Sequence, residues 1–221
     1  MDWTPLYISG RLALITTLIL MVLGAPLAYF LTFSRFKGKP LCEAIVNLPV
    51  VLPPTVLGFY LLTIMGPKGF LGRMWEWMTH TPLVFSFSGI VMASAVYSIP
   101  FAVLPMKATF TKIDRRLLES AFVLGLSSTS TFFRVVLPNS VGGIVASAVL
   151  VFVHTLGEFG VILMVGGSIP GETKVASIAI YEAVEALRYR DAGLMSLTLL
   201  VICYAVLIMV NLFSEKKSYG T

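Results

Sequence analysis

The chain has 221 residues, of which 57% are hydrophobic and only 12% are charged, and its mean hydropathy is +0.90. A soluble globular domain carries about 25% charged residues, so this composition excludes an ordinary water-soluble protein. The net charge of +5 at pH 7 fits basic loops facing an anionic leaflet. It does not indicate nucleic-acid binding, because no basic stretch is interleaved with aromatic residues.

The charged residues are clustered, which leaves five long uncharged windows of 23 to 26 residues. About 20 apolar residues suffice for a helix to cross the hydrocarbon core, whereas membrane strands would show alternation, which these windows lack. We therefore predict an all-α, polytopic helical membrane protein with a single transmembrane domain over residues 1–221. Its five spans are predicted at about residues 8–34, 44–66, 82–106, 136–165 and 192–214.

The first span is not expected to be a cleaved signal, because Asp2 and Arg11 precede its apolar core and a basic cluster follows it at Arg35, Lys37 and Lys39. With the N-terminus outside, ten Lys and Arg residues fall on the cytoplasmic side and six on the outer side. The positive-inside rule therefore favours an N-out, C-in arrangement.

The second span carries a Pro53-Pro54 pair in its middle. Proline in a membrane helix frees backbone carbonyls and bends the helix. Membrane helices contain proline more often than soluble helices do, but a pair in mid-span is rarer, and we expect a bend that shapes a cavity. The other prolines within the second and third spans are Pro49, Pro100 and Pro105.

Two segments are assigned to the outer side. Residues 66–82 are expected to form a short loop with Trp75 and Trp77 as interface anchors. Residues 175–186 are moderately apolar and helical, and we interpret them as an outer-side helix, with a sixth partial span as the alternative.

The longest cytoplasmic loop, residues 107–135, carries helical signals of its own. Asp114 is expected to cap a helix with Leu117, Leu118, Ala121, Phe122 and Leu124 on one apolar face, and Gly125 to end it. Ser127 or Ser128 then caps a second short helix. We call residues 115–138 the knob. Loop physics alone leaves two interpretations open, a compact docking element or an amphipathic loop lying on the lipid.

The knob fits the pattern Glu-x-Ala-x3-Gly-x9-[Ile/Val]-x-Leu-Pro through Glu119, Ala121, Gly125, Leu137 and Pro138. This pattern resembles the coupling motif of ABC importer permeases. Ser120 replaces the common second alanine and Val135 replaces isoleucine; both changes are conservative in size. The resemblance covers nearly the whole chain.

This resemblance implies a type I importer permease that walls the pore as a homodimer, although pairing with a similar second permease stays open. Two separate ABC ATPase subunits would use ATP and Mg²⁺, an external binding protein would deliver the substrate, and Arg115 beside the motif would pair with acidic groups on the ATPase or face the lipid. No Gly-x4-Gly-Lys-[Ser/Thr] occurs in the chain, so we expect no ATPase activity, no catalytic residue and no bound cofactor here.

Further segments resemble the oxyanion branches of that family. Residues 47–58, Asn-Leu-Pro-Val-Val-Leu-Pro-Pro-Thr-Val-Leu-Gly, and residues 155–160, Thr-Leu-Gly-Glu-Phe-Gly, are similar to molybdate and sulfate permeases. Residues 168–174, Ser-Ile-Pro-Gly-Glu-Thr-Lys, are closer to the molybdate branch. The resemblance implies transport of molybdate, with tungstate shared, across a bacterial or archaeal cytoplasmic (inner) membrane. Sulfate or another oxyanion is the alternative.

An ionisable residue at membrane depth indicates a cavity or a partner. His154 and Glu158 are four residues apart, and we expect them on one helix face. Our hypothesis is that Glu158 braces a gate helix by accepting hydrogen bonds from backbone amides or hydroxyls; a direct contact with substrate is the alternative. The full set of predicted gate and pathway residues is Pro53, Pro54, His154, Gly157, Glu158 and Gly160.

No metal site is expected, because His80 is the only other histidine and no ligands cluster around His154 and Glu158. Three other classes of protein remain as alternatives. A stand-alone carrier would need its own coupling residues, and a membrane enzyme would need a nucleophile with a base. A structural subunit without a transport path would not need the proline-bent spans.

Overall fold

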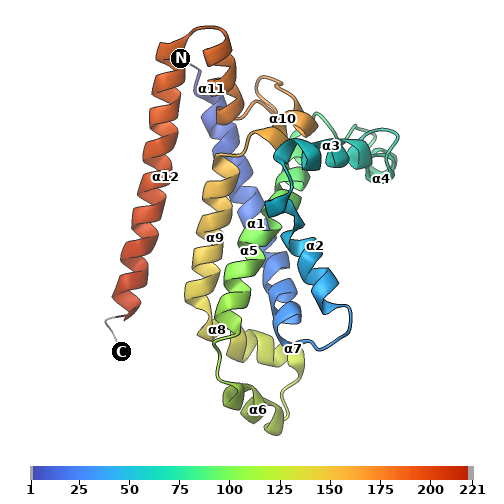
Figure 1. The fold of residues 1–221 in the computed structure, drawn as a ribbon, viewed down its shortest axis with the longest axis vertical. Helices are drawn as coiled ribbons and strands as arrows, with labels where there is room; N and C mark the ends of the chain where they lie inside the picture. The colour runs from blue at the N-terminus through green and yellow to red at the C-terminus, as the bar shows by residue number, and fades with distance from the viewer. Residues whose placement is uncertain (1, 219–221) are drawn as a thin grey trace.

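The computed structural model describes residues 2–218, and from residue 210 onward it describes the backbone alone. Within residues 2–218 the regular structure is entirely helical, as the composition predicts (Figure 1). The helices, in chain order, are α1 (Thr4–Phe33), α2 (Lys39–Val51), α3 (Pro54–Met65), α4 (Phe70–Thr79), α5 (Phe87–Phe110), α6 (Arg115–Val123), α7 (Ser128–Thr131), the π-helix η1 (Phe132–Val136), α8 (Leu137–Asn139), α9 (Val141–Leu156), α10 (Gly160–Gly166), α11 (Ala176–Glu185) and α12 (Tyr189–Ser218).

Three helices, α1, α5 and α9, lie side by side and form the centre of the molecule (Figure 1). Leu20 of α1, Ala102 of α5 and Val151 of α9 meet in one buried cluster. The long helices α1, α5 and α12 are apolar enough to cross a membrane, and two bent helix pairs add up to two more spans by the same criteria of length and composition.

The second predicted span is two helices, α2 and α3, that meet at an angle of 113°. The chain is extended at Leu52 (ψ 137°) and Pro53 (ψ 137°), because a residue followed by proline is driven out of the helical region. The predicted bend at the proline pair is therefore confirmed. By contrast, α5 continues through both Pro100 and Pro105.

The fourth predicted span, residues 136–165, is not one helix. The segment of α7, η1 and α8 is bent by 80° from α9 at Ser140, and α9 stops at Leu156. Gly157 closes α9, with its N–H pointing to the carbonyls of Val153 (3.3 Å) and His154 (3.2 Å). The chain restarts as the separate short helix α10.

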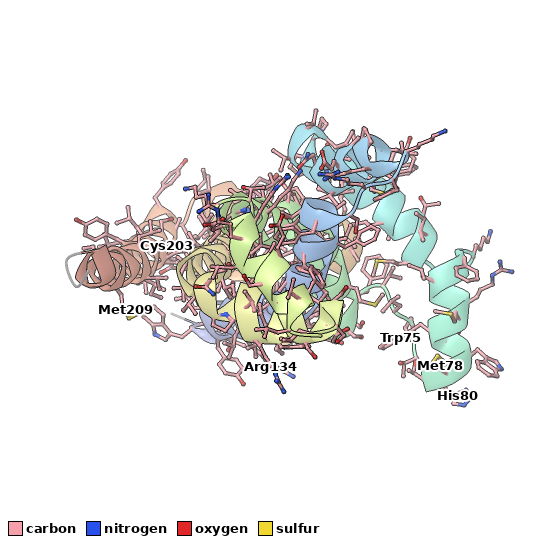
Figure 2. The ribbon with its side chains drawn as sticks, turned by 90° about the horizontal axis from the view of Figure 1, so that it is seen from below. Trp75, Met78, His80, Arg134, Cys203 and Met209 are labelled. Carbon is pink, nitrogen blue, oxygen red and sulfur yellow. The ribbon has the colours of Figure 1, made fainter. Side chains whose placement is uncertain are left out.

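The segment 66–82, expected as a loop, contains the helix α4. Gly69 precedes it, and it ends where His80 takes a left-handed φ of 56°. No proline interrupts residues 70–79, so the helix forms. In Figure 2 the labelled Trp75, Met78 and His80 lie far to one side of the bundle, opposite Cys203 and Met209 on α12. Trp77 is 81% exposed.

The predicted helix at residues 175–186 is present as α11. Its ten residues are about half of what a span requires, so the interpretation as an outer-side helix fits better than a sixth span. Ala176, Ala179 and Met195 form a buried cluster that attaches α12 to α11. The rest of α12 runs along the flank of the bundle (Figure 1).

Candidate functional site

The first half of the knob is a capped helix. The Asp114 carboxylate accepts a hydrogen bond from the Arg116 N–H at 2.9 Å, where α6 begins. Gly125 follows the helix with a left-handed φ of +80°, and the Leu126 N–H donates back to the Ala121 carbonyl at 3.0 Å. The predicted cap at Asp114 and the predicted stop at Gly125 are both confirmed.

The second half of the knob anchors it to the membrane bundle. The Ser127 hydroxyl accepts a hydrogen bond from the N–H three residues later at 3.2 Å and caps α7 as predicted. The chain then passes through η1 into α8. Phe132 and Val136 of η1 are buried in one cluster with Met106 and Phe110 of α5. The knob therefore has a rigid mechanical connection to α5.

The predicted coupling residues do not share one surface. Ala121 is only 5% exposed, because the remainder of the chain covers its side chain. The resemblance places Ala121 among the coupling residues, but its side chain faces the rest of the chain rather than an open surface. Leu137 is half-buried against the bundle. The other four are exposed: Arg115, Glu119, Gly125 and Pro138.

The far end of α6 is apolar and exposed to an unusual degree. Val123 is 87% exposed, Leu124 78% and Phe122 51%. We call these three residues the apolar tip. The expectation that Phe122 and Leu124 share one apolar face with Ala121 is wrong, because Ala121 is buried and the other two residues are exposed. Three consecutive apolar residues cannot all point to one side of a helix, and that signal was available in the sequence.

No ion pair involves the knob among the side chains described through residue 209. The pairs there are Lys107 with Glu43, Lys174 with Glu182, and Arg188 with Asp191. The first, at 2.6 Å, joins α5 to α2. Within this part of the chain, the charges of Arg115 and Glu119 are thus not committed to internal partners.

The two helix breaks predicted as gate elements lie against each other. A Cβ atom on Gly160, at the start of α10, would be 3.0 Å from the Cβ of Pro54, at the start of α3. One turn further along α3, a Cβ on Gly58 would be 2.8 Å from the Cβ of Met164. The glycines allow α3 and α10 to touch almost backbone to backbone. Pro53, Pro54, Gly157 and Gly160 therefore belong to one region of the fold.

Glu158 lies in the break between α9 and α10 and is only 4% exposed. Neither carboxylate oxygen has a hydrogen-bond partner within residues 2–218, so the predicted bracing is not made in this structure and stays a prediction. The Ser94 hydroxyl, close to the carboxylate, is also unpartnered there. It is the Glu158 backbone carbonyl that is held, by a hydrogen bond from the Ser177 hydroxyl of α11 at 2.6 Å.

His154 does not share a helix with Glu158, because α9 ends at Leu156 between them. The expectation of a common helix face is therefore wrong. The imidazole instead stacks on Phe101 (centroids 4.0 Å apart) and contacts the ring of Tyr97 (4.8 Å), both on α5. Next to it, the hydroxyls of Ser98 and Thr155 are 3.3 Å apart, which links α5 to α9 a second time.

No cluster of three metal-ligating side chains occurs in the described part of the chain. The arrangement contains two elements that can move against each other, a knob fixed to one end of α5 and a pair of broken helices beside its other end. Such an arrangement suits a transmitter of motion rather than a catalytic centre.

A family model for the inner membrane component of binding-protein-dependent transport systems matches residues 12–216. The chain belongs to this family. It is a multi-pass membrane permease subunit, and the family description implies an external binding protein as its partner.

The relatives of this chain include permeases named for molybdenum and permeases named for sulfate. This chain is 40% identical over 216 residues to the molybdenum transport system permease protein ModB of Azotobacter vinelandii, and the alignment covers 98% of this chain and 95% of that protein. It is 35% identical over 185 residues to ModB of Escherichia coli (strain K12), covering 83% and 80%. A protein of Prototheca wickerhamii, named as a probable sulfate transport system permease protein cysT, is 32% identical over 201 residues, covering 91% and 78%.

The fold also matches a solved structure of a bacterial ABC transporter that imports alginate, with a TM-score of 0.72 at 21% identity over 95% of this chain and 79% of that one. A second structure, of an alginate transporter with a pentasaccharide-bound periplasmic protein, gives 0.71 over 96% and 79%. At this identity the likeness shows the fold. The all-α importer permease architecture expected from the sequence is confirmed.

Proposed function

We propose that this permease is the transmembrane subunit of an ATP-driven importer that carries molybdate, with tungstate shared, across the inner membrane of a bacterium or archaeon. It acts as a homodimer with two ABC ATPase subunits, which hold the ATP and Mg²⁺, and with an external oxyanion-binding protein. The observation that carries the proposal is the likeness to ModB proteins along almost the whole chain. The likeness to cysT makes sulfate the second candidate.

The geometry favours coupling through α5. Its lower end packs on the knob through Met106 and Phe110. Its upper end packs on α10, where Ala93 joins Val161 and Val165 in a second buried cluster. The 24 residues of α5 span about 36 Å. A shift of the knob is transmitted along this helix to the facing breaks of α3 and α10.

The apolar tip is the surface proposed to enter the ATPase. Helices that insert an apolar face into a groove bind by burying that face, and Val123 and Leu124 have no other cover within the described chain. Nucleotide binding favours one arrangement of the two ATPases, and the tips carry that preference to the permease. Glu119 and Arg115 lie on the same helix and supply polar contacts.

Docking is tested by co-purifying the permease with its ATPase. Leu124→Asp should abolish the complex, because a charge replaces an apolar contact, while the permease itself still accumulates in the membrane. Leu187→Asp is the matched control, since Leu187 is an apolar residue, 71% exposed, that follows α11 outside the predicted spans and far from the knob. Equal retention of the ATPase by wild type and Leu124→Asp would reject the tip as the docking surface.

Transport is tested in proteoliposomes with radiolabelled molybdate and sulfate. The complete complex with binding protein and ATP should accumulate molybdate in preference to sulfate. Flux through the permease alone, without ATPase or binding protein, would instead indicate a stand-alone carrier. A preference for sulfate would instead support the second candidate function, sulfate import.

A further inference from the structure

The structure contains a pocket of about 670 Å³ between the end of α1, the turn that follows it and helix α6. Both walls belong to the end of the bundle that the positive-inside rule assigns to the cytoplasm. One wall is part of the membrane bundle and the other is part of the knob. A ligand held here touches both at once.

The pocket is predominantly cationic. Arg35 lines the pocket from the turn after α1, Lys39 from the first residue of α2, and Arg115 from the first residue of α6. Glu119 is the single carboxylate of the lining. None of the three cations forms an ion pair within residues 2–209. The Lys39 ammonium donates to the Thr32 carbonyl at 3.4 Å, which leaves two of its N–H groups for a ligand.

The other part of the lining is aromatic. Phe30 and Phe33 come from the last turn of α1, and Phe122 comes from α6. The residues Phe30 and Phe122 remain 47% and 51% exposed. A small inorganic anion gains nothing from such a wall, because it is hydrated and apolar surface does not bind it. A ligand with an anionic head and an apolar tail satisfies both parts of the lining.

The position of the pocket relative to the membrane also favours a lipid as its ligand. Helix α1 is one of the apolar membrane-length helices, and the pocket begins at its end. A helix of this length that crosses the hydrocarbon core ends among the headgroups, which we therefore expect beside the pocket. Basic pockets between helices on this side bind anionic lipid headgroups. We propose that this pocket is a binding site for an anionic phospholipid, with its phosphate held by Arg35, Lys39 and Arg115 and its acyl chains directed along α1.

A bound lipid bridges α1 and α6 and so steadies the knob. It contacts Phe122 of the apolar tip and leaves Val123 and Leu124, which do not line the pocket, free for the ATPase. The site would exist even if the transported ion were not molybdate, because it depends only on the lining residues. Lipid binding and transport are therefore separate measurements.

The test is native mass spectrometry of the purified full chain in neutral detergent, with added phosphatidylglycerol or phosphatidylcholine. We expect wild type to retain phosphatidylglycerol in preference to phosphatidylcholine. The combined variant Arg35→Gln, Lys39→Gln and Arg115→Gln should lose that preference, by about fivefold for each cation removed. The matched control removes three cations of the same side that do not line the pocket, Lys112→Gln, Arg116→Gln and Arg134→Gln, and should retain it.

Each other outcome counts against the site. Equal loss in both triple variants would mean diffuse attraction to the basic surface. Displacement of the lipid by millimolar phosphate or molybdate, with the free anion then bound, would mean that the pocket takes a soluble oxyanion. Retention by the pocket variant would mean that the cations do not hold the headgroup. Size-exclusion chromatography confirms that each variant is folded, and the single variant Lys39→Gln replaces the triple one if that aggregates.

Discussion

Gly160 at the start of α10 lies directly against Pro54 at the start of α3, so that a Cβ on the glycine would stand 3.0 Å from the proline Cβ. These residues are more than 100 positions apart in the chain. Each sits where a membrane helix is interrupted, and backbone polar groups freed by such breaks are tolerated only inside protein or beside water. The contact therefore marks the place where the permease has non-helical backbone in its interior.

Side chains larger than hydrogen at residue 160 should impair transport in order of size. Gly160→Ala forces a small separation of α3 from α10, and Gly160→Val a larger one, since overpacking costs roughly 1–3 kcal/mol. Molybdate uptake by the complete complex should fall more for Val than for Ala, while ATPase binding to the distant knob persists. Gly10→Ala is the control, because nothing lies within 4 Å of that Cβ position. Full uptake by Gly160→Val would show that the contact does not matter for transport.

Replacement of Glu158 by glutamine should slow transport severalfold and leave assembly intact. The amide has the same shape as the carboxylate, so packing at this 4% exposed position is preserved. A buried carboxylate without a partner is costly, and we infer that it gains partners when the α9–α10 break rearranges during the cycle. Undiminished uptake would refute the gate role. Thermal unfolding of the variant should occur no lower than in wild type, since no hydrogen bond of the side chain is lost.

Two neighbouring glycines of α9 should differ in how replacement by alanine changes the stability of the protein. A Cβ on Gly143 would stand 2.1 Å from the Thr109 hydroxyl oxygen and 2.6 Å from its Cβ, so Gly143→Ala pushes α9 away from α5. The free energy of unfolding should fall by roughly 1–3 kcal/mol. Gly142→Ala meets nothing within 4 Å and should be neutral or slightly stabilising through helix propensity. Thermal unfolding in detergent compares them, and equal effects would contradict the close packing of α5 and α9.

Local features of the fold could be predicted from residue types alone. Four such features are the caps at Asp114 and Ser127, the left-handed Gly125 and the break before Pro54. Each depends only on a few neighbouring residues, whose steric and hydrogen-bonding preferences are known from their types. The motif likewise located the knob between the third and fourth spans.

Features that depend on distant contacts could not be predicted. Ala121 and Leu124 are both apolar, so hydropathy alone does not tell that the packing of the chain covers Ala121 and leaves Leu124 exposed. Helix geometry shows only that the apolar run 122–124 cannot all lie on one face. The approach of Gly160 to Pro54 joins segments far apart in sequence, and no local pattern encodes it. The bend at Ser140 could not be predicted either. It lies within the uncharged window 135–157, and no charged residue or proline pair marks it in the sequence.

The outer segment should lose stability in acid through Glu182. Its carboxylate binds the Lys174 ammonium and the Ser168 hydroxyl, and these contacts hold the pKa of Glu182 below its usual value of 4.5, chiefly through Lys174. A lowered pKa in the folded state stabilises the protein at pH above 4.5, and that contribution is lost as the pH falls through the folded value. Because both side chains are partly exposed, the loss should be at most about 1 kcal/mol.

The measurement is thermal unfolding of the purified permease at neutral pH and at several values below 4.5. Wild type should be more stable than Glu182→Gln at neutral pH, and the difference should shrink as the pH is lowered through the acidic range, because protonation removes the same ion pair that the substitution removes. Glu172→Gln is the control, since Glu172 is exposed and forms no ion pair in the part of the chain with described side chains. A constant difference between wild type and Glu182→Gln across this range would show that the ion pair does not contribute, and that the variant acts through packing against Ser168 instead.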